Sequence, residues 1–274
     1  MEGTLRRWEC NDFSYWFPKV KDCGIKVPKS VFIKLPHPNN ISDEAEKQEA
    51  SKLWKAFYMS EPRKDRKIVE DWVDENVIPL LKKNNLMGHI FVKNGTFSNK
   101  FNANDSCNLY GTGKLVDALI NINYNALLVE AGGTGEVVVR EFIPYNKREI
   151  PSIYNGLPFR SEFRVFYDFD THRVIFSVNY WDYEYCYPNL YDKTDKIIFD
   201  HERKRIEETY LKFKEKAEDE IARHFKDITD LSGAWSADLL LDDKEQLWLI
   251  DMAVAEQSAY WEKRPEQTNQ KDLE

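Results

Sequence analysis

The chain has 274 residues, of which 42% are hydrophobic and 31% are charged. This balance is typical of a soluble globular protein and argues against the disordered, collagen-like and coiled-coil classes. The length predicts one large domain or two small lobes. Thirty-nine Lys and Arg residues against 47 Asp and Glu residues give a net charge of −8, which argues against nucleic acid as a partner, because such binding normally needs a basic face.

No segment approaches the roughly 18 uninterrupted apolar residues of a membrane helix. Residues 1–7 lack the apolar stretch of a signal peptide. The four cysteines form no Cys-x-x-Cys pair, so we expect reduced thiols. The five histidines show no metal-ligand spacing. We therefore expect a cytoplasmic protein with no membrane partner and no zinc site.

The first third of the chain predicts one strand and two helices. Residues 1–40 mix aromatic residues with prolines, and within them residues 31–35 indicate a short strand that prolines end. A capped amphipathic pattern predicts a helix over residues 42–55. A second apolar face predicts a helix over residues 65–83, in which Pro79 should cause a kink or a split.

The remaining two thirds alternate strands, hairpins and helices. The patterns predict two antiparallel hairpins, each with a short polar turn. A Gly-rich turn at residues 131–135 precedes a strongly β-forming run. The predicted elements are a strand at 89–93, a helix at 115–124, a strand at 136–143, a hairpin of 161–168 with 173–180, a helix at 201–225 and a hairpin of 234–241 with 246–252.

Two lysines flank a small polar loop in the middle of the chain. Lys93 ends a predicted strand, and Lys100 follows on the far side of the loop. Two ammonium groups that converge need an anion, and a polyphosphate fits, with loop amides and the hydroxyls of Ser98 or Thr96 as further donors. The alternative is two solvated surface lysines.

The strand after the Gly-rich turn ends at Glu141, Phe142 and Ile143, just before Pro144. Backbone groups that leave a ladder beside apolar side chains suit the edge of an adenine ring. The alternative is an ordinary strand end.

Further along, Glu162 and Arg164 share one face of a strand whose other face is aromatic. They could form a structural ion pair, or the guanidinium could bind phosphate or acyl-phosphate oxygens.

A pair of carboxylates lies on the last hairpin. Asp238 lies six positions before the turn centre and Asp251 eight after it, so a bulge would place both on one sheet face. Two such carboxylates repel unless a cation neutralises them, and Mg²⁺ takes one or two protein carboxylates beside nucleotide phosphates. Glu256 could add an oxygen. The alternative is that each aspartate simply ends an exposed strand.

In this order, the elements resemble the ATP-grasp fold, in which two α+β lobes with antiparallel sheets close over a nucleotide cleft. Within it, the chain resembles the cell division cycle protein 123 family and its bacterial and phage relatives, including a clade named for an arginine and two lysines. Residues 13–19 and 29–36 look like that family's aromatic-Pro and Ser-Val-Ile-Ile-x-Leu-Pro segments. Residues 92–100, 162–166 and 247–251 are similar to its lysine stretch, its Glu-Phe-Arg-x-Phe and its Val-Trp-Leu-Ile-Asp.

The resemblance implies ATP and Mg²⁺ as ligands and assigns residues to them. Lys93, Lys100 and Ser98 would bind the phosphates, residues 141–143 would form the adenine hinge, and Glu162 and Arg164 would lie in the cleft, with Arg164 and Lys100 as catalytic groups. Asp238 and Asp251 would hold magnesium. Where the family has Asp-x-Asn, this chain has Ala253 two residues after Asp251, so an amide ligand is missing and Glu256 would be its replacement.

The resemblance leaves several functions open. The first is an ATP-dependent ligase that forms an acyl phosphate, which an amine or another nucleophile on a small molecule or peptide then attacks. The second is an ATP-binding assembly factor for a protein partner, as the family implies for eukaryotic translation initiation factor two. A plain binding module is a third. A covalent nucleotidyltransferase is disfavoured, because the glycine follows Lys93 by two residues instead of three.

The predicted organisation has four parts. Residues 1–87 form an N-terminal mixed α/β region, 88–145 a small lobe with the lysine strand and the hinge, 146–264 a large lobe with the metal-binding hairpin, and 265–274 a flexible tail.

Overall fold

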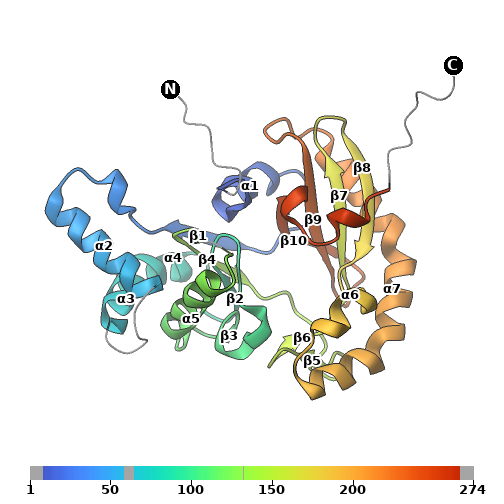
Figure 1. Ribbon diagram of the computed structural model, residues 1–274, viewed down its shortest axis with the longest axis horizontal. Helices are drawn as coiled ribbons and strands as arrows, with labels where there is room; N and C mark the ends of the chain where they lie inside the picture. The colour runs from blue at the N-terminus through green and yellow to red at the C-terminus, as the bar shows by residue number, and fades with distance from the viewer. Residues whose placement is uncertain (1–8, 59–64, 132, 266–274) are drawn as a thin grey trace.

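The computed structural model describes residues 9–58, 65–131 and 133–265, so most of the predicted tail at 265–274 lies outside the described residues. Two lobes, each built on a four-stranded antiparallel sheet, face each other in Figure 1. The helices are α1 (Phe13–Val20), α2 (Glu44–Tyr58), α3 (Arg66–Trp72), α4 (Ile78–Lys83), α5 (Leu115–Leu128), α6 (Tyr183–Cys186) and α7 (Lys193–Phe225). The strands are β1 (Ser30–Lys34), β2 (His89–Lys93), β3 (Asn108–Tyr110), β4 (Glu136–Glu141), β5 (Ser152–Ile153), β6 (Leu157–Pro158), β7 (Glu162–Asp168), β8 (Arg173–Asn179), β9 (Ala234–Leu241) and β10 (Leu247–Val254).

The first lobe holds the sheet with strand order β1-β4-β2-β3. Its central strand β4 is a run of valines, and Val137, Val138 and Val139 are all buried. Helices α2 to α5 supply most of the apolar side chains that pack with this sheet. Because β1 pairs with β4, part of the predicted N-terminal region of residues 1–87 belongs to the sheet of this lobe.

The predicted helix over residues 65–83 is split, as Pro79 requires. Helix α3 ends at Trp72, a π-helical turn covers Val73–Val77, and α4 begins at Ile78 with Pro79 in its first turn. The π-helical turn accommodates the proline, because backbone bonding shifts there, as the hydrogen bond from the Ile78 amide to the Val73 carbonyl shows.

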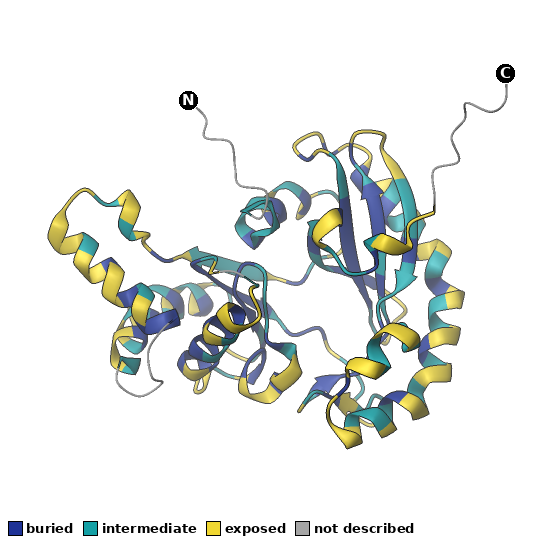
Figure 2. Cartoon of the chain, viewed as in Figure 1, coloured by how far each residue is buried: buried dark blue, intermediate teal, exposed yellow. Residues whose placement is uncertain are grey.

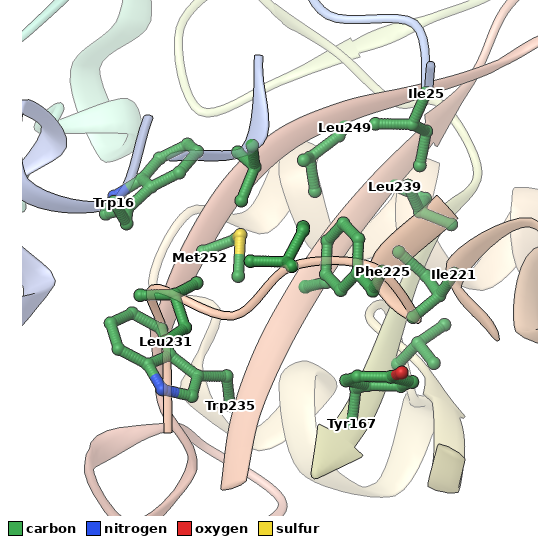
Figure 3. Close-up of a cluster of buried hydrophobic side chains, with 14 of the residues drawn as sticks. Trp16, Ile25, Tyr167, Ile221, Phe225, Leu231, Trp235, Leu239, Leu249 and Met252 are labelled. Carbon is green, nitrogen blue, oxygen red and sulfur yellow. The ribbon is translucent and has the colours of Figure 1, made fainter. Parts of the chain in front are cut away.

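The second lobe holds the sheet with strand order β10-β9-β7-β8, and the long helix α7 packs against β7 and β8. Figure 3 shows Phe225 and Ile221 of α7 in one cluster with Leu239 of β9 and Leu249 of β10. Trp16 from the N-terminal segment joins the same cluster. Burial in Figure 2 is densest along the sheet strands, whereas the outer face of α7 is exposed.

Some elements were not predicted. Helix α1 contains Pro18 near its end, which hid it in the aromatic and proline-rich start. Helix α7 begins at Lys193 instead of near residue 201, because the Asp192 carboxylate accepts hydrogen bonds from the amides of Thr194 and Asp195. Across the described residues, we find no helix with the length and apolar character needed to span a bilayer.

Candidate functional site

A cavity of about 110 Å³ lies between the two lobes, and we call it the interlobe cleft. Strands β2 and β4 line it from the first lobe, and β7, β9 and β10 line it from the second. The chain segments that meet there are far apart in sequence. Nine of the residues singled out in the sequence line it: Lys93, Ser98, Lys100, Glu141, Phe142, Ile143, Glu162, Asp238 and Asp251.

Lys93 links the two lobes across the cleft. Its side chain is only 2% exposed, and its ammonium donates hydrogen bonds to both carboxylate oxygens of Asp251, at 2.9 and 2.8 Å. Burial lowers the pKa of Lys93, and Asp251 opposes this shift. The buried cation therefore has one strong partner, and that partner is 38% exposed at the cleft.

Lys100 lies at the other side of the polar loop, in the same cavity. Its ammonium donates a hydrogen bond to the phenol oxygen of Tyr180 and lies 5.0 Å from the ring centroid of Trp181. Burial raises the pKa of the nearby Glu162 carboxyl, and Lys100 opposes this shift. The two lysines thus line one cavity from the two ends of the polar loop.

The two aspartates of the last hairpin are direct cross-strand partners. Asp251 lies opposite Asp238, and the register shift that this requires occurs between Leu249 and Asp251. Opposed residues of an antiparallel pair have Cβ atoms about 5 Å apart, so both carboxylates share one face. The Asp238 carboxylate accepts hydrogen bonds from Arg164 Nε at 2.7 Å and from its second terminal nitrogen at 2.8 Å.

Arg164 does not line the cleft. Both it and Asp238 are nearly buried, with side chains 12% and 10% exposed, and the guanidinium also donates to the Ala259 carbonyl at 3.2 Å. Its donors are thus committed to the protein. In this structure Arg164 holds the Asp238 carboxylate in place and is not among the residues that line the cleft.

The segment 141–143 borders the cleft with less free backbone than we expected from the sequence. The Phe142 amide donates to the His89 carbonyl at 3.1 Å, and the Ile143 carbonyl accepts from Arg160 at 2.9 Å. The expectation of backbone groups without hydrogen-bond partners is therefore wrong for the Phe142 amide and the Ile143 carbonyl. The Glu141 carboxylate, in turn, accepts from the Lys29 amide at 2.7 Å.

Two buried arginines in the cleft were missed by the sequence analysis. Arg140 donates to the Ile250 carbonyl of the opposite lobe, and Arg160 packs near the Phe142 ring. The Nε atom of each is buried without an acceptor in the described part of the chain. Burial lowers the pKa of Arg160 to about 10, so the group stays charged at neutral pH. Each arginine is a single charged residue near a strand end, so no sequence motif points to it.

Glu256 lies outside the cleft. It is exposed in a 3₁₀ turn, Ala255–Gln257, and lines neither the cleft nor the other cavities described here. Across residues 9–58, 65–131 and 133–265, no three His, Cys, Asp or Glu side chains are grouped so as to hold a metal ion. A metal ion bound in the cleft would need Asp238 and Asp251, together with oxygen ligands from water or from a bound molecule.

Comparisons with known proteins give the fold. No protein-family model and no curated protein sequence matches the chain. Cdc123 from Schizosaccharomyces pombe is similar in structure, with a TM-score of 0.55, 14% sequence identity, and coverage of 97% of this chain and 95% of that one. D-alanine–D-alanine ligase from Bacillus anthracis, complexed with ATP, has a TM-score of 0.41, 11% identity, and coverage of 89% and 53%.

A third similar structure is the ATP-grasp ligase PsnB complexed with a minimal precursor, with a TM-score of 0.37, 11% identity, and coverage of 95% and 56%. The match to Cdc123 spans nearly the full length of both chains. The chain therefore has an α+β, ATP-grasp-like fold related to that of Cdc123.

Proposed function

We propose that the chain binds ATP with Mg²⁺ in the interlobe cleft. The observation that carries the proposal is the convergence of four cations on one cavity, of which Lys93, Arg140 and Arg160 are buried and the two arginines keep an unpaired Nε donor among the described residues. Buried donors without acceptors cost free energy, and an anionic ligand with many oxygens would satisfy them. Lys93, Lys100 and Arg140 thus fit a polyphosphate, and Arg160, beside Phe142, would lie toward the base.

Magnesium fits the opposed carboxylates of Asp238 and Asp251. This ion keeps several waters and takes only one or two protein carboxylates when nucleotide phosphates supply further oxygens. Bound there, it would bridge phosphate oxygens and neutralise their charge. Ala253, which lines a neighbouring cavity, offers no side-chain oxygen, so we infer a single ion held by two carboxylates.

Nucleotide entry requires the cleft to open. A volume of about 110 Å³ is below the roughly 300–1,000 Å³ of ligand sites in proteins. The links that hold the lobes together there include the ion pair of Lys93 with Asp251 and the hydrogen bond from Arg140 to Ile250. We infer that a nucleotide replaces the first link, because phosphate then pairs with Lys93 and the metal with Asp251.

The activity that we propose for this site is that of an ATP-dependent ligase. ATP would supply a phosphoryl group for a carboxylate substrate. Lys93 and Lys100 would hold the oxygens of that group, and the cleft walls would exclude water from it. Arg164 would act through Asp238, as a positioning residue. No covalent nucleophile on the protein is needed.

A second candidate function is that of an ATP-binding assembly factor for a protein partner. The observation in its favour is the near-complete mutual coverage with Cdc123, which leaves little of either chain unmatched. The absence of an amide at position 253 points the same way, since a weaker metal site suits binding better than turnover.

A titration of the full chain with ATP and Mg²⁺, followed by calorimetry, tests the binding site. We expect Lys100→Ala and Asp251→Ala each to weaken binding by about 100-fold while unfolding stays cooperative, and Lys204→Ala, on the exposed face of α7, to bind as the unmodified chain does. Unchanged affinity in both cleft variants would refute the site. ADP release that requires an added carboxylate and amine supports the ligase, whereas binding without turnover supports the assembly factor.

A further inference from the structure

A second cavity of about 1140 Å³ adjoins the interlobe cleft. We call it the N-terminal pocket, because the segment before α1 forms one wall. The described residues of the Gly-rich loop, 130–131 and 133–135, and the end of β10 form others. Asp251 is shared by the linings of the two cavities. The Gly-rich turn noted in the sequence thus has a place at a cavity that the proposed nucleotide site does not use.

The Gly-rich loop lies directly against an aromatic wall. Gly135 has a φ of +63°, and a Cβ atom there would lie 2.5 Å from the indole ring of Trp54. Glycine is therefore required for this close approach. The Trp54 indole donates to the Pro36 carbonyl at 2.8 Å, which fixes the ring at the pocket.

The lining of the N-terminal pocket is predominantly acidic. Its carboxylates come from Glu9, Asp12, Glu130 and Asp251, against the single ammonium of Lys34. The Lys34 ammonium lies 3.3 Å from the carboxylate of Glu136, which is fully buried behind the wall. Glu136 therefore largely neutralises the charge of Lys34, and the lining of the pocket has an excess of negative charge.

The Asp12 carboxylate lacks a hydrogen-bond donor among the described residues, whereas the neighbouring Glu136 accepts two hydrogen bonds from Ser14. Burial and then Glu136 raise the pKa of Asp12 to about 7, with Glu9 acting in the same sense and Lys34 and Lys93 opposing. A half-buried acid that lacks a donor is costly to keep, which is typical of a functional site.

We propose that the N-terminal pocket binds a ligand with a protonated aliphatic amine, which the Asp12 carboxylate receives close to Asp251 at the edge of the interlobe cleft. An ammonium supplies both the donors and the positive charge that the wall lacks. The pocket is large enough for a polyamine or a lysine side chain. The inference deepens the proposed function, because an amine held there would lie beside the nucleotide, but its own test needs no nucleotide.

Spermidine is the probe, titrated into the full chain by calorimetry at about 150 mM salt, which screens the attraction of a polycation to a protein of charge −8. We expect saturable binding that Asp12→Asn weakens at least tenfold. Asp219→Asn, an equal change of charge on the exposed face of α7, leaves the affinity unchanged. Equal affinity in the two variants, or no saturable binding to the unmodified chain, would overturn the proposal.

A second variant and a pH series guard against a merely structural effect. Ala253→Phe fills the pocket without a change in charge and is expected to weaken spermidine binding at least tenfold, since Ala253 lines it. Spermidine affinity should rise from pH 6 to pH 8 as Asp12 ionises, and Asp12→Asn should flatten this rise. A rise of equal size in both proteins would contradict the assignment.

The same protein titrated with ATP separates the two proposals. Spermidine binding without ATP binding would refute the nucleotide site and leave the amine pocket standing. ATP binding without spermidine binding would refute the amine pocket alone.

Discussion

The interlobe cleft and the N-terminal pocket share Asp251 but have opposite electrostatic characters. The cleft brings four cations together with four carboxylates, whereas the pocket has four carboxylates and one lysine. In the cleft, the buried charges compensate one another across the lobes, as Lys93 and Asp251 do. In the pocket, Asp12 stays without a hydrogen-bond donor from the described residues. Under the two proposals, the cleft would exchange internal ion pairs for MgATP, whereas the pocket would bind a cation.

The largest effect on the free energy of unfolding is expected from Arg164, which holds the Asp238 carboxylate with two hydrogen bonds. Arg164→Met should lower the free energy of unfolding by about 3–5 kcal/mol, because it leaves a nearly buried carboxylate without its partner. Urea denaturation measures this change. Arg203→Met is the control, since its side chain is 46% exposed and its loss should cost less than about 1 kcal/mol. An equally small loss in Arg164→Met would mean that the guanidinium is not structural.

Removal of an ammonium group from the cleft should weaken ATP binding and leave spermidine binding unchanged. We expect Lys93→Met and Lys100→Met each to weaken ATP binding by about 100-fold, because a hydrogen bond between charged groups contributes about 1.5–3 kcal/mol. Calorimetry with ATP and then with spermidine gives both affinities. Spermidine affinity should stay unchanged in Lys100→Met, which lies outside the N-terminal pocket. A parallel loss of both ligands would merge the two cavities into one site.

A smaller effect is expected from Arg160, which lies at the end of the cleft beside Phe142 and Ile143. If its guanidinium contacts the base, Arg160→Met weakens ATP binding by about tenfold, equivalent to the loss of one hydrogen bond. The affinity for inorganic tripolyphosphate, which has no base, should stay the same. An equal loss for both ligands would place Arg160 at the phosphates instead.

The smallest effect concerns the stability of the pocket wall. The pKa of Asp12 in the folded chain, about 7, is above the usual value near 4, so the folded state holds the proton more tightly. The stability that this proton contributes is full below about pH 4 and is lost as pH rises to 7. Asp12→Asn should therefore gain about 1–2 kcal/mol relative to the unmodified chain between pH 4 and pH 8, a figure reduced for partial exposure.

Urea denaturation across this pH range measures the gain. Asp219→Asn, on the exposed face of α7, should give a difference that does not vary with pH. A flat difference for Asp12→Asn as well would mean that its carboxyl is ordinary, and the contrast between the two cavities would then rest on the lining charges alone.

Local patterns were sufficient to predict most strands and the order of the cleft residues. The count around the last turn predicted that Asp238 and Asp251 share a face if a bulge intervenes, and the register confirms this. The split at Pro79 was predictable for a similar reason, since the constraint acts within a few residues.

Contacts between distant segments could not be predicted in this way. Lys93 and Asp251 are 158 positions apart, and nothing in either segment specifies that they pair. Asp12 precedes an aromatic run without any pattern of its own, and its raised pKa arises first from burial and then from Glu136, on a strand far along the chain. Such features depend on how the two lobes pack, which is a property of the tertiary structure.

The most direct test of nucleotide binding in the cleft is a titration of the unmodified full chain with ATP, with and without Mg²⁺, at constant ionic strength. The account predicts one saturable site per chain, at least tenfold tighter with Mg²⁺, from which ADP displaces ATP. No saturable binding at millimolar ATP in the presence of Mg²⁺ would contradict it.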